Sequence, residues 1–319
     1  MSNAQLQQAI QLLSDENVVC VPTETVYGLA ASMHSERAIE KIYAIKGRPR
    51  TNPLIVHIGR KEDLSLLCTE VPAPLQRLID RFWPGPLTIL VEKSVQVPDS
   101  ITAGSSRVGI RMPNHPLTLE LLQRLPFPLV APSANPYNAI SPTTAKHVEA
   151  YFGSAIPLIL DGGPCQQGLE STVVGVENGQ VVIYRQGMIT AEQIEALVGP
   201  VIVKNEVGEK QVAPGMTAKH YAPNTPTILC EHPDIFAKEA AGKAFLLFNK
   251  KYATLPSEHQ YLLSESGDIE EAAQRLYQCL HELDRKSYQQ IICERFPEEG
   301  VGRAINDRLR RAGGSSLSE

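Results

Sequence analysis

The chain contains 319 residues, of which 43% are hydrophobic and 20% are charged, and its formal net charge is −5 at pH 7. This length and apolar content suffice for two globular domains, each with a core of its own. The slightly acidic balance excludes a global basic field that would draw the chain onto nucleic acid or an anionic membrane, so any anion-binding site has to be local.

The cysteines and the hydropathy pattern indicate a cytoplasmic protein. The six cysteines are scattered, and no C-x-x-C pair suggests a metal site or a disulfide framework, so we expect reduced thiols in the core. The N-terminus lacks a basic region followed by an apolar stretch, and nowhere do about eighteen apolar residues run together. We therefore expect no membrane association.

The N-terminal segment predicts a helix, a strand and a polar cluster. Helical spacing of apolar residues predicts a helix over 3–14, and a short apolar strand follows at 18–21, where Pro22 stops it. The next segment places the hydroxyl groups of Thr23, Thr25 and Tyr27 beside Gly28. Such a cluster either binds a small polar ligand or reflects ordinary strand propensity.

A loop that carries Lys46, Arg48 and Arg50 is the strongest local concentration of charge. It follows a helix predicted over 36–45, whose C-terminal end suits Gly47, and it precedes a core strand at 54–56. Pro49 and Pro53 stiffen the loop, so it holds its charges in place. The loop is either an anion-binding site or a solvated turn.

Prolines divide the segment that follows. Helices are predicted at 64–67 and 75–82, with a break at Pro72 and Pro74 because proline lacks the N–H that a helix interior needs. Trp83, the only tryptophan, is expected to anchor the core rather than to form a ligand platform.

Two strands are predicted beyond the tryptophan, at 87–92 and within 103–112. In the second, a period of two places Arg107, Gly109 and Arg111 on one face. Two arginines on one strand face form either a solvated face or a wall of an anion site.

Residues 116–187 are expected to continue the α/β pattern. The predicted elements are a helix at 116–124 and strands at 127–130, 156–160 and 181–187. Ser133, Asn135 and Ser141 lie among prolines, which is typical of turns and also of rigid loops that present polar groups to phosphate or sugar. Ser171 precedes an apolar β-branched run, and Arg185 lies near the end of the last strand.

Residues 199–224 are poor in apolar periodicity, and we interpret this segment as a linker. Beyond it, strands at 227–230, 244–248, 261–263 and 290–293 alternate with helices, which predicts a small α/β domain with parallel strands. Its clearest helix begins at Asp268 as N-cap. A basic helix over 300–311 follows, and we interpret its cations as a solvated face.

The residue inventory favours chemistry on a polyanion. The sequence lacks the Walker A loop, the G-x-G-x-x-G turn, H-E-x-x-H and the G-x-S-x-G elbow. Cations and small hydroxyl residues instead recur at predicted strand ends and loops. Reactions on nucleoside triphosphates depend mainly on positioning and charge neutralisation, which such residues supply.

Several motifs carry a family resemblance. They are Pro22-Thr23-Glu24-Thr25-Val26-Tyr27-Gly28-Leu29, Lys46-Gly47-Arg48-Pro49, Asn52-Pro53-Leu54, Trp83-Pro84-Gly85-Pro86, Arg111-Met112-Pro113, Pro132-Ser133-Ala134-Asn135 and Ser171-Thr172. Together they resemble the threonylcarbamoyl-AMP synthase family, with its YrdC-like fold, over residues 5–186. The motif Lys219-His220-Tyr221-Ala222-Pro223 and the residues after it resemble the long form of the family.

The resemblance implies a fold and an activity. Residues 1–198 would form a twisted, mixed α/β sheet with helices around a basic cavity, 199–224 a linker packing over the active site, and 225–319 a smaller Rossmann-like α/β domain. The enzyme, a nucleotidyltransferase, would join L-threonine, bicarbonate and ATP into threonylcarbamoyl-adenylate and release pyrophosphate, with Mg²⁺ accompanying ATP. This is the first step towards threonylcarbamoyladenosine in tRNA, so downstream tRNA threonylcarbamoyl-transfer machinery and a weak RNA contact are implied as partners.

The resemblance also assigns residues to the two substrates. The residues implied for ATP are Lys46, Arg50, Arg107, Ser133, Ser141, Arg185 and Tyr221. Those implied for L-threonine are Thr23, His57, Arg111, Ala131 through its backbone, and Ser171. Lys46, Arg50 and Arg111 would be the catalytic cations, and no metal ligand is assigned.

Two other functions stay open at this point. A basic cavity could hold the backbone of double-stranded RNA or tRNA without nucleotide turnover, although the net charge of −5 argues against it. The same fold also occurs as a carbamoyl-transfer domain in hydrogenase-maturation proteins, but the sequence shows no acylphosphatase or zinc-finger segment beside it.

Overall fold

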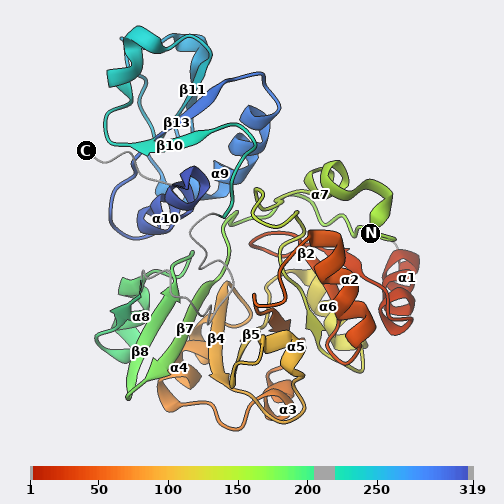
Figure 1. The fold of residues 1–319 in the computed structure, drawn as a ribbon. Helices are drawn as coiled ribbons and strands as arrows, with labels where there is room; N and C mark the ends of the chain where they lie inside the picture. Colours follow the sequence, from red (N-terminus) through yellow and green to blue (C-terminus); the bar gives the residue numbers. More distant parts are fainter. Residues whose placement is uncertain (1–2, 205–219, 315–319) are drawn as a thin grey trace.

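The computed structural model describes residues 3–204 and 220–314, which form two α/β domains (Figure 1). In the described part of the chain, the larger sheet has nine strands in the order β1-β2-β6-β3-β5-β4-β7-β8-β9 and mixes parallel with antiparallel pairs. Its strands are β1 (Val19–Val21), β2 (Gly28–Ser32), β3 (Ile55–His57), β4 (Leu87–Glu92), β5 (Arg107–Arg111), β6 (Leu129–Val130), β7 (Thr172–Glu177), β8 (Gln180–Arg185) and β9 (Ile202–Val203). This mixed sheet confirms the fold class expected for the N-terminal half.

Helices surround the larger sheet and bury apolar faces against it. They are α1 (Asn3–Ser14), α2 (Glu36–Lys46), α3 (Leu64–Leu67), α4 (Ala73–Phe82), α5 (Asp99–Thr102), α6 (Pro116–Arg124), α7 (Ala145–Phe152) and α8 (Ala191–Val198), with 3-10 turns η1 (Lys61–Asp63) and η2 (Gly153–Ala155). Ile39 and Ile42 of α2 and Leu78 of α4 belong to the main apolar cluster, as does Trp83. The prediction that Trp83 anchors the core is therefore confirmed.

Two sequence predictions in this half are wrong. Residues 156–160 do not form a strand, because the segment meets the sheet only at Cys20, with which it exchanges two backbone hydrogen bonds. Pro74 does not break α4 but lies in its first turn, where a missing N–H costs no helical hydrogen bond. The helices α7 and α8 were not predicted.

The C-terminal domain is a parallel sheet with helices, as expected. Among the described residues its four strands follow the order β10-β13-β11-β12, and all their pairs are parallel. The elements are β10 (Thr227–Cys230), η3 (Pro233–Glu239), β11 (Lys243–Leu247), η4 (Ser257–His259), β12 (Gln260–Leu262), α9 (Ile269–Asp284), β13 (Gln290–Glu294) and α10 (Gly302–Gly313). Asp268 caps α9, since its side chain accepts the N–H groups of Glu270 and Glu271. No described helix is both long and apolar enough to cross a bilayer, and all six cysteines are free thiols.

The two domains share one apolar cluster. Val26, Ile140 and Leu169 of the N-terminal domain pack in the same cluster as Leu276 and Leu280 of α9. Figure 1 shows α9 and α10 on the side of the C-terminal domain that faces the larger sheet. The interface is therefore built like a domain core, which fixes the position of the second domain over the first.

Two buried histidines meet in this interface. The rings of His147 on α7 and His281 on α9 are stacked with their centroids 3.8 Å apart. Nε2 of His281 lies 3.1 Å from the carbonyl oxygen of Ser141, so this nitrogen carries the proton. Burial, reinforced by the neighbouring His281 and by Arg285, lowers the pKa of His147 to about 3. Burial also lowers the pKa of His281 to about 4, with Arg285 adding to this and Asp284 and the Ser141 carbonyl opposing it.

We expect the protein to lose stability as the pH falls below about 6.5. In this range His147 and His281 become protonated in the unfolded state, whereas in the folded state their lowered pKa values keep them neutral. Each histidine can lower the free energy of unfolding by at most about 1.4 kcal/mol per pH unit, and this loss is absent above about pH 6.5. The His281→Gln variant, whose amide can still donate to Ser141, should show a shallower slope between pH 7 and pH 5 in urea unfolding. His34→Gln, at an exposed position, should keep the wild-type slope. Equal slopes in the two variants would contradict the prediction.

Candidate functional site

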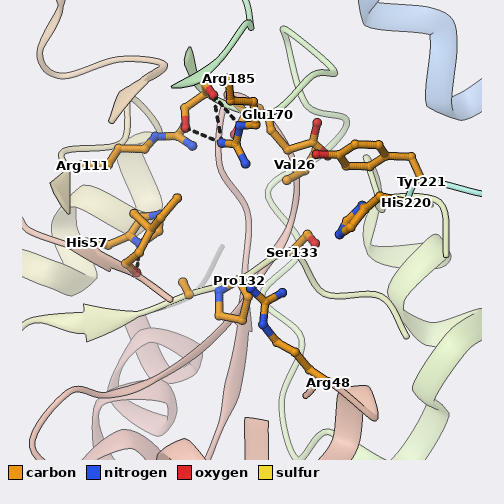
Figure 2. A pocket seen from close by; sticks show the side chains of 14 residues that line it. Val26, Arg48, His57, Arg111, Pro132, Ser133, Glu170, Arg185, His220 and Tyr221 are labelled. Carbon is orange, nitrogen blue, oxygen red and sulfur yellow. Dashed lines mark hydrogen bonds between the residues drawn. The ribbon is translucent and has the colours of Figure 1, made fainter. Parts of the chain in front are cut away.

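A pocket lies where strand ends of the larger sheet meet the linker residues His220 and Tyr221 (Figure 2). Of the residues predicted for the site, its lining includes His57, Arg111, Ala131, Ser133, Ser171, Arg185 and Tyr221. The lining residues that were not predicted are Thr25, Val26, Arg48, Ile55, Pro132, Glu170 and His220. The pocket thus contains most of the residues predicted to bind L-threonine and some of the residues predicted to bind ATP.

The sheet register explains why distant segments meet here. In the parallel pair β3 and β5, His57 lies opposite Arg111. Ile55 lies two residues before His57 and therefore shares its face, and its carbonyl accepts the N–H of Ala131 at 3.2 Å. The register therefore places His57, Arg111 and Ala131, three residues predicted to bind L-threonine, on one side of the pocket.

Lys46 lies directly behind the pocket wall. It occupies the last turn of α2, and Gly47 caps the helix with a left-handed φ of 61°, as expected for a glycine at this position. The Lys46 Nζ donates to the carbonyl oxygens of Ser133 and Asn135, both at 2.6 Å. Burial and the neighbouring Arg48 lower its pKa well below the ordinary value. Lys46 thus holds the loop whose Ser133 lines the pocket.

Arg48 is the cation of the charged loop that lines the pocket. Its Nη2 donates to Asn52 Oδ1 at 2.6 Å and to the Pro53 carbonyl at 2.7 Å. Burial lowers its pKa to about 10, so the guanidinium is still charged at neutral pH. Arg50, by contrast, is 71% exposed and paired with Glu40, outside the pocket lining.

Arg111 and Glu24 form a buried ion pair at the pocket. The Arg111 Nη2 lies 2.7 Å from Glu24 Oε1, and the side chains are 6% and 2% exposed. The contact lacks hydrogen-bond alignment, so both Glu24 oxygens and the Nε and Nη2 atoms of Arg111 have no hydrogen-bond partner among the described residues. Buried polar atoms of this kind are normally satisfied. The unfilled hydrogen-bonding capacity of Arg111 is suited to a ligand with oxygen acceptors, such as a carboxylate.

Arg185 and Ser171 are joined at another wall. The Arg185 Nη2 donates to the Ser171 carbonyl at 2.8 Å and to the Ser171 Oγ at 3.0 Å. The same hydroxyl lies 2.7 Å from the hydroxyl of Thr88 on β4. These contacts fix the orientation of Ser171, whose side chain is fully buried.

The two histidines of the pocket are neutral at physiological pH. Burial, together with the charge of Arg111, lowers the pKa of His57 to about 3. Burial and the nearby Arg48 also lower the pKa of His220 well below its ordinary value. The positive charge of the lining therefore comes from Arg48, Arg111 and Arg185. Among the described residues, the lining contains one carboxylate, that of Glu170.

Three further predicted residues lie outside the lining. The Thr23 Oγ1 accepts the N–H groups of Thr25 and Val26, so it shapes a turn that lines the pocket. Ser141 donates to Glu170 Oε1 at 2.6 Å, in the domain interface. Arg107 donates to the Tyr184 hydroxyl at 2.8 Å, and of the two arginines predicted to share a strand face only Arg111 lines the pocket.

The linker reaches the pocket through its last residues. Tyr221 is 1% exposed and its ring packs against that of His220, with a centroid distance of 4.0 Å. Its hydroxyl has no hydrogen-bond partner among the described residues. Linker residues 205–219, including Lys219 of the sequence motif, lie outside the described residues.

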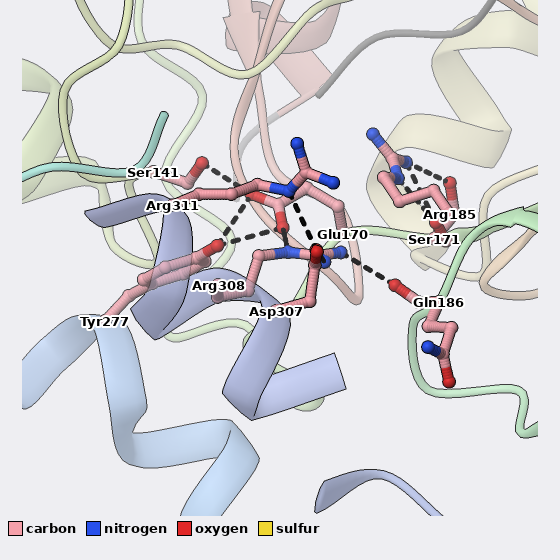
Figure 3. A network of polar contacts seen from close by, with 9 residues as sticks. All are labelled: Ser141, Glu170, Ser171, Arg185, Gln186, Tyr277, Asp307, Arg308 and Arg311. Carbon is pink, nitrogen blue, oxygen red and sulfur yellow. Dashed lines mark hydrogen bonds and ion pairs between the residues drawn. The ribbon is translucent and has the colours of Figure 1, made fainter. Parts of the chain in front are cut away.

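The cations of the basic C-terminal helix do not all form a solvated face: Arg310 is exposed as expected, but Arg308 and Arg311 are buried, which corrects the sequence interpretation for these two. Arg308 of α10 is 1% exposed and Arg311 is 9% exposed. Arg308 Nε donates to Glu170 Oε2 of the N-terminal domain at 2.8 Å, whereas Arg311 Nε donates to Asp307 Oδ1 of the same helix at 2.9 Å (Figure 3). Sequence reasoning thus missed Glu170, Arg308 and His220, and it named Arg48 in the charged loop without assigning it to a substrate.

Comparison with known proteins agrees with this architecture. A family model described as telomere recombination, covering Sua5, YciO and YrdC, matches residues 11–187, and a model of the C-terminal domain of threonylcarbamoyl-AMP synthase matches residues 189–314. The chain is 40% identical to threonylcarbamoyl-AMP synthase of Bacillus subtilis, over 99% of this chain and 95% of that protein. It is 37% identical to the Pyrococcus abyssi enzyme, over 96% of this chain and 93% of that protein.

A solved structure extends the agreement to the whole fold. The crystal structure of P. abyssi Sua5 complexed with L-threonine is similar to this chain with a TM-score of 0.92 and 35% identity, over 100% of this chain and 97% of that one. Both domains and their arrangement are therefore common to the two proteins. The chain belongs to the threonylcarbamoyl-AMP synthase family and has the two-domain, long form of its members.

Proposed function

We propose that this protein is an L-threonylcarbamoyladenylate synthase, which forms threonylcarbamoyl-AMP and pyrophosphate from L-threonine, bicarbonate or CO₂, and ATP. The observation that carries the proposal is a single pocket with arginines on different walls, one of which keeps unfilled hydrogen-bonding capacity. In Figure 2 Arg111 and Arg48 enter the pocket from opposite sides. Such a site has room to divide its charges between an amino-acid carboxylate and a triphosphate.

The threonine half of the site would be built around Arg111. Its guanidinium would pair with the substrate carboxylate, in agreement with the L-threonine bound in the P. abyssi relative. Ser171 and the Ala131 backbone line the same pocket and would orient the substrate. Because His57 is neutral, Arg111 would supply the positive charge that pairs with the carboxylate. Thr23 would contribute by shaping the adjacent turn.

The ATP half would use the charged loop and its neighbours. Lys46, Arg48 and Arg185 would offset the triphosphate charge, with Ser133 and Tyr221 on the adjoining walls. Arg48 is not among the residues that the family resemblance assigned to ATP, and the structure adds it as a pocket-lining cation. The roles of Arg50, Arg107 and Ser141 in ATP binding are predictions from the family resemblance, and these side chains, like that of Lys46, lie outside the pocket lining.

Positioning and charge neutralisation would then drive the reaction. The amine of threonine takes up CO₂ and loses a proton, which gives a carbamate. A carbamate oxygen attacks the α-phosphorus of ATP, the bond to the β-phosphate oxygen breaks, and pyrophosphate leaves with the electron pair. The buried cations stabilise charge on the leaving group where water would otherwise screen it.

Mg²⁺ would enter with ATP. The described residues contain no group of three or more His, Cys, Asp or Glu side chains suited to a metal ion. In general, Mg²⁺ keeps several waters and binds through substrate phosphates rather than in a protein cage. The ion would add to the neutralisation of the triphosphate.

The deciding experiment is incubation of the protein with ATP, L-threonine and bicarbonate, followed by mass spectrometry for the adenylate and an assay for pyrophosphate. We expect both products, and both should depend on threonine. Consumption of carbamoyl phosphate in place of threonine would favour the carbamoyl-transfer alternative, and salt-sensitive RNA binding without turnover would favour the RNA-binding one.

The product also suggests the cellular setting. A threonylcarbamoyl-adenylate is an activated acyl donor, so a tRNA threonylcarbamoyl-transfer machinery would consume it, and a weak RNA contact at the pocket would assist the hand-over. We place the reaction in the cytoplasm, in keeping with the free state of all six cysteines.

A further inference from the structure

Glu170 is an unexpected residue in a pocket for a triphosphate, because a carboxylate repels phosphate. It is 6% exposed and lines the pocket beside Arg185. Burial by itself would raise its pKa, but the Arg308 and Arg185 guanidinium groups outweigh burial and hold the pKa below its ordinary value. The carboxylate is therefore ionised at neutral pH and needs a counter-charge.

The C-terminal domain supplies most of that compensation (Figure 3). The Tyr277 hydroxyl of α9 donates to Glu170 Oε2 at 2.9 Å, and Arg308 Nε of α10 donates to the same oxygen at 2.8 Å. From the N-terminal domain, Ser141 donates to Oε1 at 2.6 Å, and Arg185 adds a nearby positive charge. The charge of a pocket-lining residue is thus balanced largely by the other domain.

Arg308 touches the pocket lining at a second point. Its guanidinium carbon lies 5.0 Å from the ring centroid of Tyr221, which is within the range of a cation–π contact. Its Nη2 also donates to the carbonyl of Gln186 at 2.9 Å, directly after β8 and Arg185. One side chain of the C-terminal domain therefore joins Glu170, the linker residue Tyr221 and the end of β8.

Stability alone does not account for this arrangement. Desolvating a buried ion pair offsets much of its Coulomb attraction, and apolar residues of similar size stabilise an interface at least as well. The interface already has a shared apolar cluster. The same helix also makes a peripheral ion pair, Arg303 with Glu192, in which the Glu192 side chain is 54% exposed and neither residue lines the pocket.

We infer that Arg308 is a positioning residue for the nucleotide half of the site, which neutralises Glu170 across the domain interface and so keeps the pocket able to accept a triphosphate. The inference rests on the proposed function and gives the C-terminal domain a part in it. Arg308 acts through Glu170 and Tyr221 and has no contact with the reacting atoms. Loss of its charge should weaken ATP binding and leave threonine binding nearly intact.

The test compares full-length variants by calorimetry with ATP and by steady-state kinetics. We expect Arg308→Gln to raise the Kd for ATP roughly tenfold or more, because the negative charge of Glu170 then faces the phosphates without its main counter-charge. The KM for threonine should stay within about threefold of wild type, as expected from a site that separates the two substrates. Arg303→Gln, the matched control on the same helix, should bind ATP like the wild-type chain.

A double variant separates neutralisation from a general loss of packing. Arg308→Gln combined with Glu170→Gln removes both charges of the Glu170–Arg308 pair, and Asp307 keeps its ion pair with Arg311. The double variant should therefore fold even where the single variant does not, and its Kd for ATP should return to within about threefold of wild type. ATP binding by Arg308→Gln as tight as wild type, or by the double variant as weak as the single one, would overturn the inference. A wild-type chain that binds ATP and forms no adenylate would refute the proposed function alone, since the ATP affinities still test Arg308.

Discussion

The Lys46→Met variant is expected to release threonine-dependent pyrophosphate at least roughly 100-fold more slowly than the wild-type chain. Two effects add: a cation is lost beside the nucleotide half, and the carbonyls of Ser133 and Asn135 lose the ammonium group that holds them at 2.6 Å. Methionine keeps the length and the apolar stem of lysine, so α2 should remain. Pyrophosphate release with and without threonine, at saturating ATP, measures the effect.

The companion variant is Arg50→Met, which removes an exposed cation from the same loop. A much smaller loss in this variant would place the catalytic charge at Lys46 and Arg48, and an equal loss would support the role predicted for Arg50 from the family. The Ser133 carbonyl would keep only the N–H of Asn135, at 3.1 Å, and the Asn135 carbonyl would lose its Lys46 donor. A buried acceptor left without a donor costs about 1–3 kcal/mol, so circular dichroism should show a lower melting temperature for Lys46→Met. Wild-type turnover by Lys46→Met would remove Lys46 from the site.

The Arg111→Gln variant is expected to raise the KM for threonine roughly 10- to 150-fold, the range for one lost hydrogen-bonded ion pair. The KM for ATP should change far less. The single variant leaves Glu24 buried without its cation, which by itself destabilises the fold by about 3–5 kcal/mol.

A second variant, Arg111→Gln with Glu24→Gln, removes both charges and should recover most of the melting temperature. Its KM for threonine should stay high, because the carboxylate of the substrate still lacks a cation. Recovery of threonine affinity together with stability would mean that Arg111 supports the fold and does not bind the substrate.

Local patterns were sufficient to predict much of the catalytic half. Helical spacing predicted α1, and the placement of Lys46 before Gly47 predicted a helix end with a left-handed cap, as the structure has it. Period two in β5 placed Arg111 on a face with Arg107. These features depend on residues close in sequence, where backbone geometry alone decides the outcome.

The choice between Arg48 and Arg50 could not be made from spacing. Both lie in one stiff loop, and the direction of each side chain depends on acceptors that the fold brings near it. Asn52 and Pro53 capture Arg48 on the inner side, whereas Glu40 of α2 pairs with Arg50 on the outer side. The family resemblance directed attention to Arg50, and the geometry added Arg48.

Arg308 was missed for a different reason, although the sequence contained a signal. It lies four residues after Ala304 and four before Ala312, on the buried face of α10. An arginine at an apolar position predicts a buried partner. The identity of that partner, Glu170, depends on how two domains meet, and no local pattern contains that information.

The shared apolar cluster has a consequence for experiments on parts of the protein. Val26, Ile140 and Leu169 are covered by the C-terminal domain, so a chain cut after residue 198 would expose them to water. Exposed apolar patches promote self-association, and Glu170 in the same fragment would lack Tyr277 and Arg308. The activity of such a fragment would reflect aggregation and an altered pocket charge, and it would not measure the contribution of the missing domain.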